Sequence, residues 1–186
     1  RRADTQAIGT SKKRKESSKD WALSSKRKVT INDFKNQMLV NIREYYTKNG
    51  KELPGSKGVA LNPEQWKALC NVKGEITKAV EALDDSKGPW ELPKRKRATV
   101  SKYKEMWLVD IRETYIKDGK TLPGRKGISL KAEQWGKLAK HMDDVSAALE
   151  DALDEQENQP IAPPKTKAKK VKGKMGDGDA EENSED

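Results

Sequence analysis

Two kinds of side chain recur together in this chain, and they suit a polyanion that carries planar rings. Arg43, Tyr46 and Lys57 stand in one segment, and the same residue types return 69 positions later. Lysine and arginine attract phosphate groups, while an exposed aromatic ring stacks on an unpaired nucleobase. A double helix hides the faces of its bases, so the combination favours single-stranded nucleic acid.

The aromatic candidates differ in their expected exposure. Phe34 and its counterpart Tyr103 are balanced between the edge of a core and a stacking role, and the hydroxyl of Tyr103 favours exposure. Tyr46 and Tyr115 end a strand before a turn, where a ring is often half-exposed, so stacking is favoured. Arg43 and Tyr46 are three residues apart, and they share a strand face only if a bulge or a strand end separates them.

The candidate nucleic-acid-binding residues are the cations and aromatic rings that recur in both copies. Lys57 and Lys126 follow the Pro-Gly pairs, and each taken alone would be an ordinary solvated loop lysine. The set is Arg27, Phe34, Lys35, Arg43, Tyr46, Lys57, Lys96, Tyr103, Lys104, Arg112, Tyr115 and Lys126.

The chain offers little for catalysis. The single histidine, His141, falls in one copy only, and no nucleophile, base and acid are grouped. The sequence has no phosphate-binding loop of the Gly-x4-Gly-Lys-Ser/Thr type and no Cys/His spacing for a metal. The single cysteine, Cys70, cannot form an internal disulfide and suits a core position in a reducing compartment. We therefore expect no enzyme, no catalytic residue, no metal and no cofactor.

Charge indicates the class of partner. The net charge is +9, and residues 1–28 carry ten Lys or Arg against three acids. Basic blocks favour nucleic acid over a membrane as partner, with mere solubility as the alternative. No apolar run reaches the roughly 18 residues of a membrane span. Residues 12–15, Lys-Lys-Arg-Lys, resemble a nuclear import signal, and their alternative interpretation is a solvated basic tail.

The spacing of 69 belongs to a long internal repeat. Of the 41 positions that align 29–69 with 98–138, 21 are identical. Two tandem copies of one small domain explain such a match. The predicted order is a disordered basic tail, a first domain, a linker, a second domain and a disordered tail that is lysine-rich and then acidic. Their bounds are 1–20, 21–83, 84–89, 90–153 and 154–186.

Each copy is predicted to begin with strands. An apolar period of two, as at Met38, Val40 and Ile42, marks the centre of one strand. Short connections make neighbouring strands antiparallel. Tight hairpin turns are predicted at Asn49-Gly50 and Asp118-Gly119, and type II turns at Pro54-Gly55 and Pro123-Gly124. The strand regions are 21–61 and 90–130.

A helix is predicted to follow each set of strands. Asn62-Pro63-Glu64 supplies an N-cap, a first-position proline and a first-turn acid, while Lys131-Ala132 lacks the cap and the proline. Gly74 should cost the first helix about 1 kcal/mol. The apolar stripes place tryptophans in the core, as expected also for Trp21, Trp90 and Trp107. The stripes are Trp66, Leu69, Ile76, Val80 and Leu83, and Trp135, Leu138, Met142, Val145 and Leu149.

Residues 28–66 resemble the single-stranded DNA-binding domain of the eukaryotic coactivator family called positive cofactor 4. Residues 97–135 resemble it too, less closely at Lys131-Ala132. The blocks Ile-Arg-Glu-x-Tyr, Pro-Gly-x-Lys-Gly and Glu-Gln-Trp, in this order, carry the resemblance. It implies an α+β fold of two tandem domains, each a four-stranded antiparallel sheet followed by a helix. It also implies a dimer with helices at the interface and sheets that bind antiparallel single strands.

The resemblance also assigns roles to residues. It implies stacking at Phe34/Tyr103 and Tyr46/Tyr115, although the family's usual tryptophan is tyrosine at the latter pair. It implies phosphate binding at Arg43/Arg112 and Lys57/Lys126, and it adds Lys94 and Arg125 to the candidate set. The first copy has Ser25 and Ser56 at those two positions, so the second copy is expected to bind more tightly.

These observations predict a nuclear protein that binds single-stranded DNA and acts as a coactivator of RNA polymerase II at melted or unwound DNA. The expected partners are single-stranded DNA and the transcription machinery, with no membrane. The alternatives are an architectural chromatin protein on duplex DNA, an RNA-binding protein and a protein-interaction scaffold. The short linker leaves two arrangements open, an intrachain pseudo-dimer and a homodimer.

Overall fold

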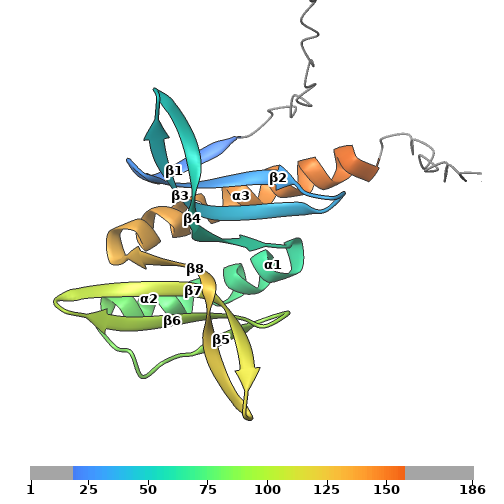
Figure 1. Ribbon diagram of the computed structural model, residues 1–186. Helices are drawn as coiled ribbons and strands as arrows, with labels where there is room; N and C mark the ends of the chain where they lie inside the picture. Colours follow the sequence, from blue (N-terminus) through green and yellow to red (C-terminus); the bar gives the residue numbers. More distant parts are fainter. Residues whose placement is uncertain (1–18, 158–186) are drawn as a thin grey trace, which may run out of the picture.

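Two antiparallel sheets of four strands each form the framework of the protein (Figure 1). The computed structural model describes residues 19–157. The predicted import signal and most of both predicted tails lie outside the described residues. The first sheet contains β1 (Asp20–Ser24), β2 (Arg27–Asp33), β3 (Met38–Lys48) and β4 (Lys51–Leu61). The second contains β5 (Trp90–Leu92), β6 (Lys96–Tyr103), β7 (Met106–Lys117) and β8 (Lys120–Lys131). The predicted strand regions and their antiparallel order are confirmed.

The helices are α1 (Pro63–Asn71), α2 (Lys73–Glu81) and α3 (Ala132–Glu157). Asn62 caps α1 as predicted, since its side chain accepts from the Gln65 amide at 2.8 Å while the Gln65 side chain accepts from the Asn62 amide at 3.0 Å. The first copy's helix is interrupted at Val72, two residues before Gly74, whereas α3 is continuous. Because α3 ends at Glu157, the prediction of disorder from Asp154 is wrong for its first four residues.

The alternation of side chains gives each sheet one apolar face. Val40 and Ile42 of β3 are fully buried, as are Val109 and Ile111 of β7. Both helical tryptophans, Trp66 and Trp135, are buried, so the prediction that they belong to the core is confirmed. The helices therefore cover one face of each sheet and leave the opposite face outward.

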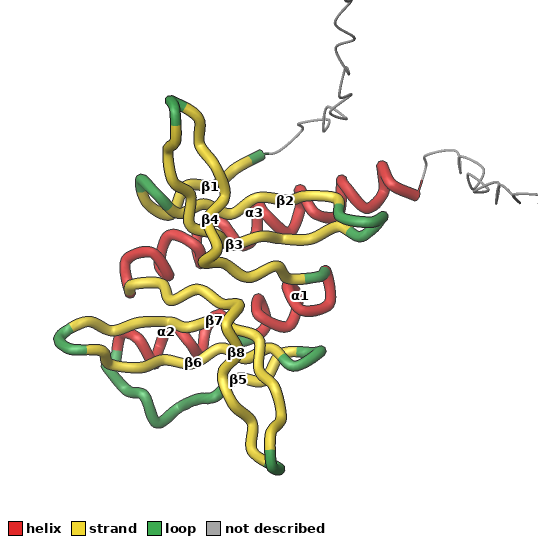
Figure 2. The backbone as a smooth tube through the Cα atoms, viewed as in Figure 1, coloured by secondary structure: helices red, strands yellow, loops and turns green. Residues whose placement is uncertain are grey.

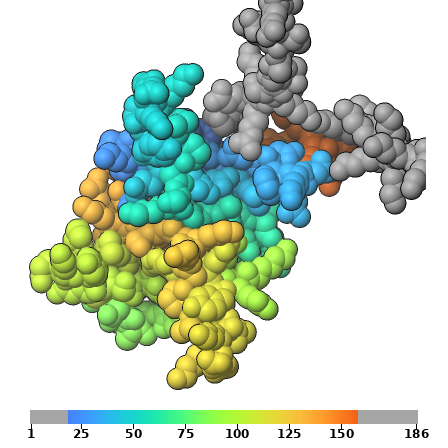
Figure 3. Space-filling view, viewed as in Figure 1, coloured from blue at the N-terminus to red at the C-terminus, as the bar shows by residue number. Residues whose placement is uncertain are grey.

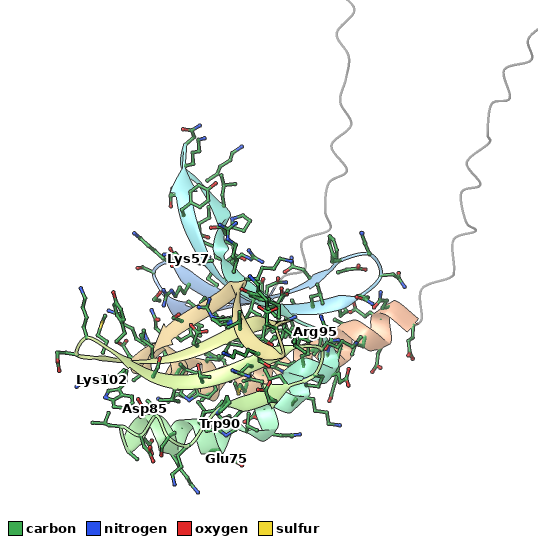
Figure 4. The ribbon with its side chains drawn as sticks, turned by 60° about the horizontal axis from the view of Figure 1, so that its bottom comes forward. Lys57, Glu75, Asp85, Trp90, Arg95 and Lys102 are labelled. Carbon is green, nitrogen blue, oxygen red and sulfur yellow. The ribbon has the colours of Figure 1, made fainter. Side chains whose placement is uncertain are left out.

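The two halves of the chain share this core. Contacts join α3 to β1, β2 and β3 of the first sheet as well as to β7 and β8 of its own. In the other direction, α2 contacts β6 and β7, and α1 contacts β5. The strands β4 and β8 lie against each other between the sheets (Figure 1). Figure 4 shows Trp90 beside Glu75 of α2, whose carboxylate accepts the indole N–H at 2.8 Å.

Reciprocal hydrogen bonds fix the register of the halves. The Trp66 indole donates to Ser146 Oγ at 2.9 Å, and the Trp135 indole donates to Thr77 Oγ1 at 3.0 Å. Ser146 and Thr77 are equivalent positions, 69 residues apart. Each hydroxyl donates to the carbonyl four residues earlier and so turns its lone pairs to the incoming indole. The same pair of bonds therefore forms twice, related by exchange of the halves.

The turns predicted at the hairpin tips are present, whereas those predicted at the two Pro-Gly pairs are not. Asn49 and Gly50 have φ of 52° and 71°, so the tight turn predicted there is confirmed, as is its counterpart in the second copy. Pro54-Gly55 lies inside β4, and the prediction of a type II turn is wrong for it and for Pro123-Gly124 in β8. The pairing of β3 with β4 shifts between Arg43 and Tyr45, so Pro-Gly marks a bulge.

No helix between residues 19 and 157 combines the length and hydropathy needed to cross a membrane.

Leu83 departs from the apolar stripe predicted for it. It lies past the end of α2 with φ of 54° and a relative exposure of 59%. Its amide donates to Val80, and the amide of Asp84 donates to Ala79, which closes the helix in a Schellman motif. The residue that closes the helix adopts a left-handed conformation, and this requirement rather than the apolar spacing decides where the Leu83 side chain lies.

Replacing Leu83 with glycine should stabilise the protein. A left-handed leucine costs about 1–2 kcal/mol, part of which is offset by the larger unfolded-state entropy of glycine. We expect a gain of about 0.5–1 kcal/mol in the free energy of unfolding, measured by urea denaturation. Leu83→Ala keeps the Cβ and should give no such gain. Equal stabilisation by both variants would contradict the explanation.

Candidate nucleic-acid interface

The β3–β4 and β7–β8 hairpins form two arms that extend from the body in opposite directions (Figure 2). Each arm bends at the bulge, where the Arg43 guanidinium donates to the Gly55 carbonyl at 2.8 Å and Arg112 donates to Gly124 at 3.0 Å. Of the bulge and the strand end that the sequence left open between Arg43 and Tyr46, the structure has a bulge. The two candidate arginines therefore hold the arms in shape in addition to presenting charge.

Glycine makes room for these arginines. Gly58 lies opposite Arg43 on the neighbouring strand, and a Cβ there would be 2.9 Å from Arg43 Cγ. A Cβ on Gly127 would be 2.5 Å from Arg112 Cβ. A Cβ on Gly55 would meet the Glu44 carbonyl at 2.9 Å. The repeated Pro-Gly-x-Lys-Gly motif thus keeps the bulge narrow enough for the arginine to span it.

The candidate aromatic rings are open to solvent. Relative exposure is 52% for Phe34, 59% for Tyr103, 50% for Tyr46 and 46% for Tyr115. The exposure favoured for the first pair and the partial exposure predicted for the second are both confirmed. Lys35 Nζ lies 5.4 Å from the Phe34 ring centroid, and Lys104 Nζ lies 5.7 Å from that of Tyr103. Each β2–β3 or β6–β7 hairpin tip therefore presents a ring and a cation side by side.

The candidate cations fall into two groups. Lys57, Lys126, Lys94 and Arg125 are exposed. Arg27 is half-buried, where it donates to the Ser129 carbonyl at 2.7 Å and to Gln134 at 2.6 Å across the two halves. Lys96 is 8% exposed and lies 3.5 Å from Glu113. The structure thus places Lys96 in the interior and Arg27 at the junction of the halves, although the sequence put both among the candidate nucleic-acid-binding residues.

Cations of both copies converge at this junction, a feature the sequence could not reveal. A hollow of about 300 Å³ is lined by Gly127, Ile128 and Ser129 together with Arg27, Lys57, Arg112 and Arg125. The lobes that meet there are seen in Figure 3, blue to cyan above and green to yellow below. Four positive side chains around one hollow suit the phosphate backbone of a nucleic acid.

Carboxylates balance part of this charge in different places in the two copies. Lys28 contacts Glu52 at 2.5 Å and Asp20 at 3.2 Å, and these bonds raise the pKa of its ammonium group. In the second sheet, Arg112 Nε and Nη2 donate to Asp110 at 2.6 and 2.7 Å, which raises the pKa of the guanidinium. The residue equivalent to Asp110 in the first copy is Asn41. Among the described residues, no group of three or more His, Cys, Asp or Glu is arranged to hold a metal ion.

Outward sheets with exposed rings, bulge-spanning arginines and converging cations define a tandem α+β protein whose surface suits a nucleic acid. The repeat unit matches the family model described as Transcriptional Coactivator p15 (PC4) twice, at residues 21–72 and 90–141. The chain therefore belongs to the PC4 family, as a member with two copies of the domain. The family is named for a coactivator rather than an enzyme.

Relatives carry the same domain. The RNA polymerase II transcriptional coactivator KELP of Arabidopsis thaliana is 52% identical over 62 residues, which are 33% of this chain and 38% of the relative. The RNA polymerase II transcriptional coactivator of Drosophila melanogaster is 48% identical over 61 residues, 33% of this chain and 56% of the relative. A solved MoSub1–ssDNA complex is 33% identical, with 42% of this chain and 94% of the other covered and a TM-score of 0.36. The matches to the two coactivators span less than two thirds of those proteins.

Gly58→Ala should distort the first arm. The added Cβ would displace Arg43 from the Gly55 carbonyl or shift the strand, and such overpacking typically costs about 1–3 kcal/mol. The free energy of unfolding, from chemical denaturation, should fall by that amount. Gly136→Ala is the matched control, because its Cβ meets nothing within 4 Å and lies in a helix. A loss in the control equal to that in Gly58→Ala would contradict the proposed close fit.

Proposed function

We propose that this protein binds single-stranded DNA and acts as a coactivator of RNA polymerase II at melted or unwound DNA. Rings on the hairpins stack on unpaired bases, and the cations of both copies hold the phosphates. The observation that carries the proposal is the paired exposure of Phe34 and Tyr103, each beside a lysine, and of Tyr46 and Tyr115 on the arms. About half of each ring is open to solvent at the same place in both copies, which core packing alone does not explain.

Family membership supports the coactivator role, since relatives from a plant and an insect bear that name. Such a role places the protein in the nucleus, with the transcription machinery as its protein partner. The catalytic step would then belong to the polymerase, and this chain would contribute binding alone.

Removing the rings tests the stacking. Tyr46→Ala combined with Tyr115→Ala should weaken binding to a single-stranded oligonucleotide at least about tenfold, because each base stack contributes roughly 1–3 kcal/mol. Fluorescence anisotropy with labelled single-stranded and duplex DNA measures the effect. Ile116→Ala is the control, as this residue is 62% exposed and neighbours Tyr115. Duplex binding equal to that of single strands, and unaffected by the substitutions, would instead identify an architectural protein.

The binding of phosphates is tested separately by Lys57→Ala with Lys126→Ala. These lysines are exposed and leave the arginine–bulge bonds intact, so folding should be unchanged. The slope of log affinity against log salt should fall by about 0.7 for each phosphate of a single strand that the variant no longer neutralises. An unchanged slope would exclude these lysines from the interface.

We further infer that one chain folds as its own pseudo-dimer. The reciprocal tryptophan bonds and the helix–sheet contacts between halves are all made within the chain. The linker raises the effective concentration of one half for the other to the millimolar range, so pairing within the chain is favoured over pairing between chains. Light scattering should therefore give a mass of 20.9 kDa in dilute solution. A dimer of chains that persists at nanomolar concentration would overturn this inference.

A further inference from the structure

The outward faces of the two sheets differ at their centres. Among the positions that differ between the sheets, three bear on the centre of this face: Asn41 becomes Asp110, Tyr45 becomes Thr114 and Ala60 becomes Ser129. Strand pairing sets Asp110 between Thr99 on β6 and Ser129 on β8. The second sheet thus has a polar centre made of a carboxylate and two hydroxyls.

In the first sheet a tyrosine lies over the corresponding face. Lys28 Nζ is 5.6 Å from the Tyr45 ring centroid, and the Tyr45 hydroxyl lies 3.5 Å from Thr30 Oγ1. Thr30 is the counterpart of Thr99. The ring therefore covers the strand positions that remain open in the second copy.

The second sheet is hollow where the first is covered. Thr114 is small and directs its hydroxyl to the Arg95 carbonyl at 3.2 Å. The hollow has a volume of about 370 Å³ and is lined by Arg97, Thr99, Ser101, Asp110, Arg112, Thr114 and Pro123. Small-molecule sites typically measure about 300–1,000 Å³, so a space of this size suits a single planar group.

The bonding state of Asp110 determines what the hollow can accept. One carboxylate oxygen accepts from Arg112 Nε, and the other accepts from Arg112 Nη2 and from Ser129 Oγ at 2.5 Å. A carboxylate has about four acceptor sites, so one remains on the first oxygen. Arg112 uses three of its five N–H groups, for Asp110 and Gly124, and keeps two. The pair is neutral in sum and offers acceptors and donors side by side.

We propose that this hollow is a nucleobase subsite for bases that carry an exocyclic amino group. A phosphate presents acceptors alone and would meet the Asp110 carboxylate here, whereas the edge of a base presents donors and acceptors together. The amino group donates to Asp110, a ring nitrogen or carbonyl accepts from Arg112, and the Pro123 ring provides an apolar contact. Thymine carries a carbonyl where cytosine carries its amino group, so Asp110 repels it. This inference rests on the proposed binding of single strands.

The test compares oligo(dC) with oligo(dT) of equal length, because the two pyrimidines are similar in size and reverse donor and acceptor on the edge that would meet Asp110 and Arg112. The background is the full chain with Phe34→Ala and Tyr46→Ala, which leaves the second sheet to dominate binding. We expect oligo(dC) to bind about fivefold more tightly than oligo(dT) in fluorescence anisotropy, the contribution of one hydrogen bond. Thr114→Tyr, which fills the hollow as Tyr45 does, should abolish the difference.

Asp110→Asn provides a second variant that keeps shape and volume. Its amide offers a donor to the thymine carbonyl, so the preference should disappear through a gain for oligo(dT). Asn41→Asp is the matched control on the first sheet and should leave the preference intact. A preference that survives both Thr114→Tyr and Asp110→Asn, or equal binding of the two oligonucleotides, overturns the subsite while leaving the proposed function standing. Absence of all binding in the unsubstituted chain overturns both.

Discussion

The structure depends on the exchange of two indole hydrogen bonds between the halves. Small domains bury a limited share of their surface, and each helix here completes its burial by contacting the sheet of the other half. The Trp66 and Trp135 N–H groups are buried donors that would cost about 1–3 kcal/mol each if left without a partner. Because Ser146 and Thr77 supply those partners from the opposite half, folding of the core and pairing of the halves are one process.

The outward surface inherits its geometry from this core. With one face of each sheet covered by helices, the other is free, and the bulges bend each arm away from the body. Arg43 and Arg112 span the bulges and belong to the surface that we propose binds single strands. Charge and shape are therefore set by the same side chains, and a change in either arginine alters both.

Much of this was accessible from the sequence, because the governing signals were local. Strand alternation, the Asn49-Gly50 turn and the Asn62 cap each act within a few residues, and the repeat offered two examples of every signal. The errors arose where distant residues decide. Pro54-Gly55 suits a turn and a bulge equally, and the approach of Glu44 selects the bulge. Likewise, Lys96 is basic in any sequence, and its burial beside Glu113 depends on the folded sheet.

Site residues showed the same division. The exposure of Tyr46 and Tyr115 followed from their place at the end of a strand. The hollow between the halves joins Arg27 and Lys57 to Arg112 and Arg125, and such a meeting requires knowledge of how the halves dock. We expected the second copy to bind more tightly because it has more cations. That count ignored the carboxylates that pair with them, as Asp110 does with Arg112.

Fusion of the two copies has a consequence for direction. A dimer of identical chains has a two-fold axis, so it presents the same surface to each strand of an opened duplex and cannot tell one from the other. Here Tyr45 lies on the first sheet and Thr114 at the equivalent position of the second, and both belong to one chain. Mutation can change one side without changing its mate. The covalent link thereby allows the two sheets to differ, so that the paired halves lose their exact two-fold symmetry.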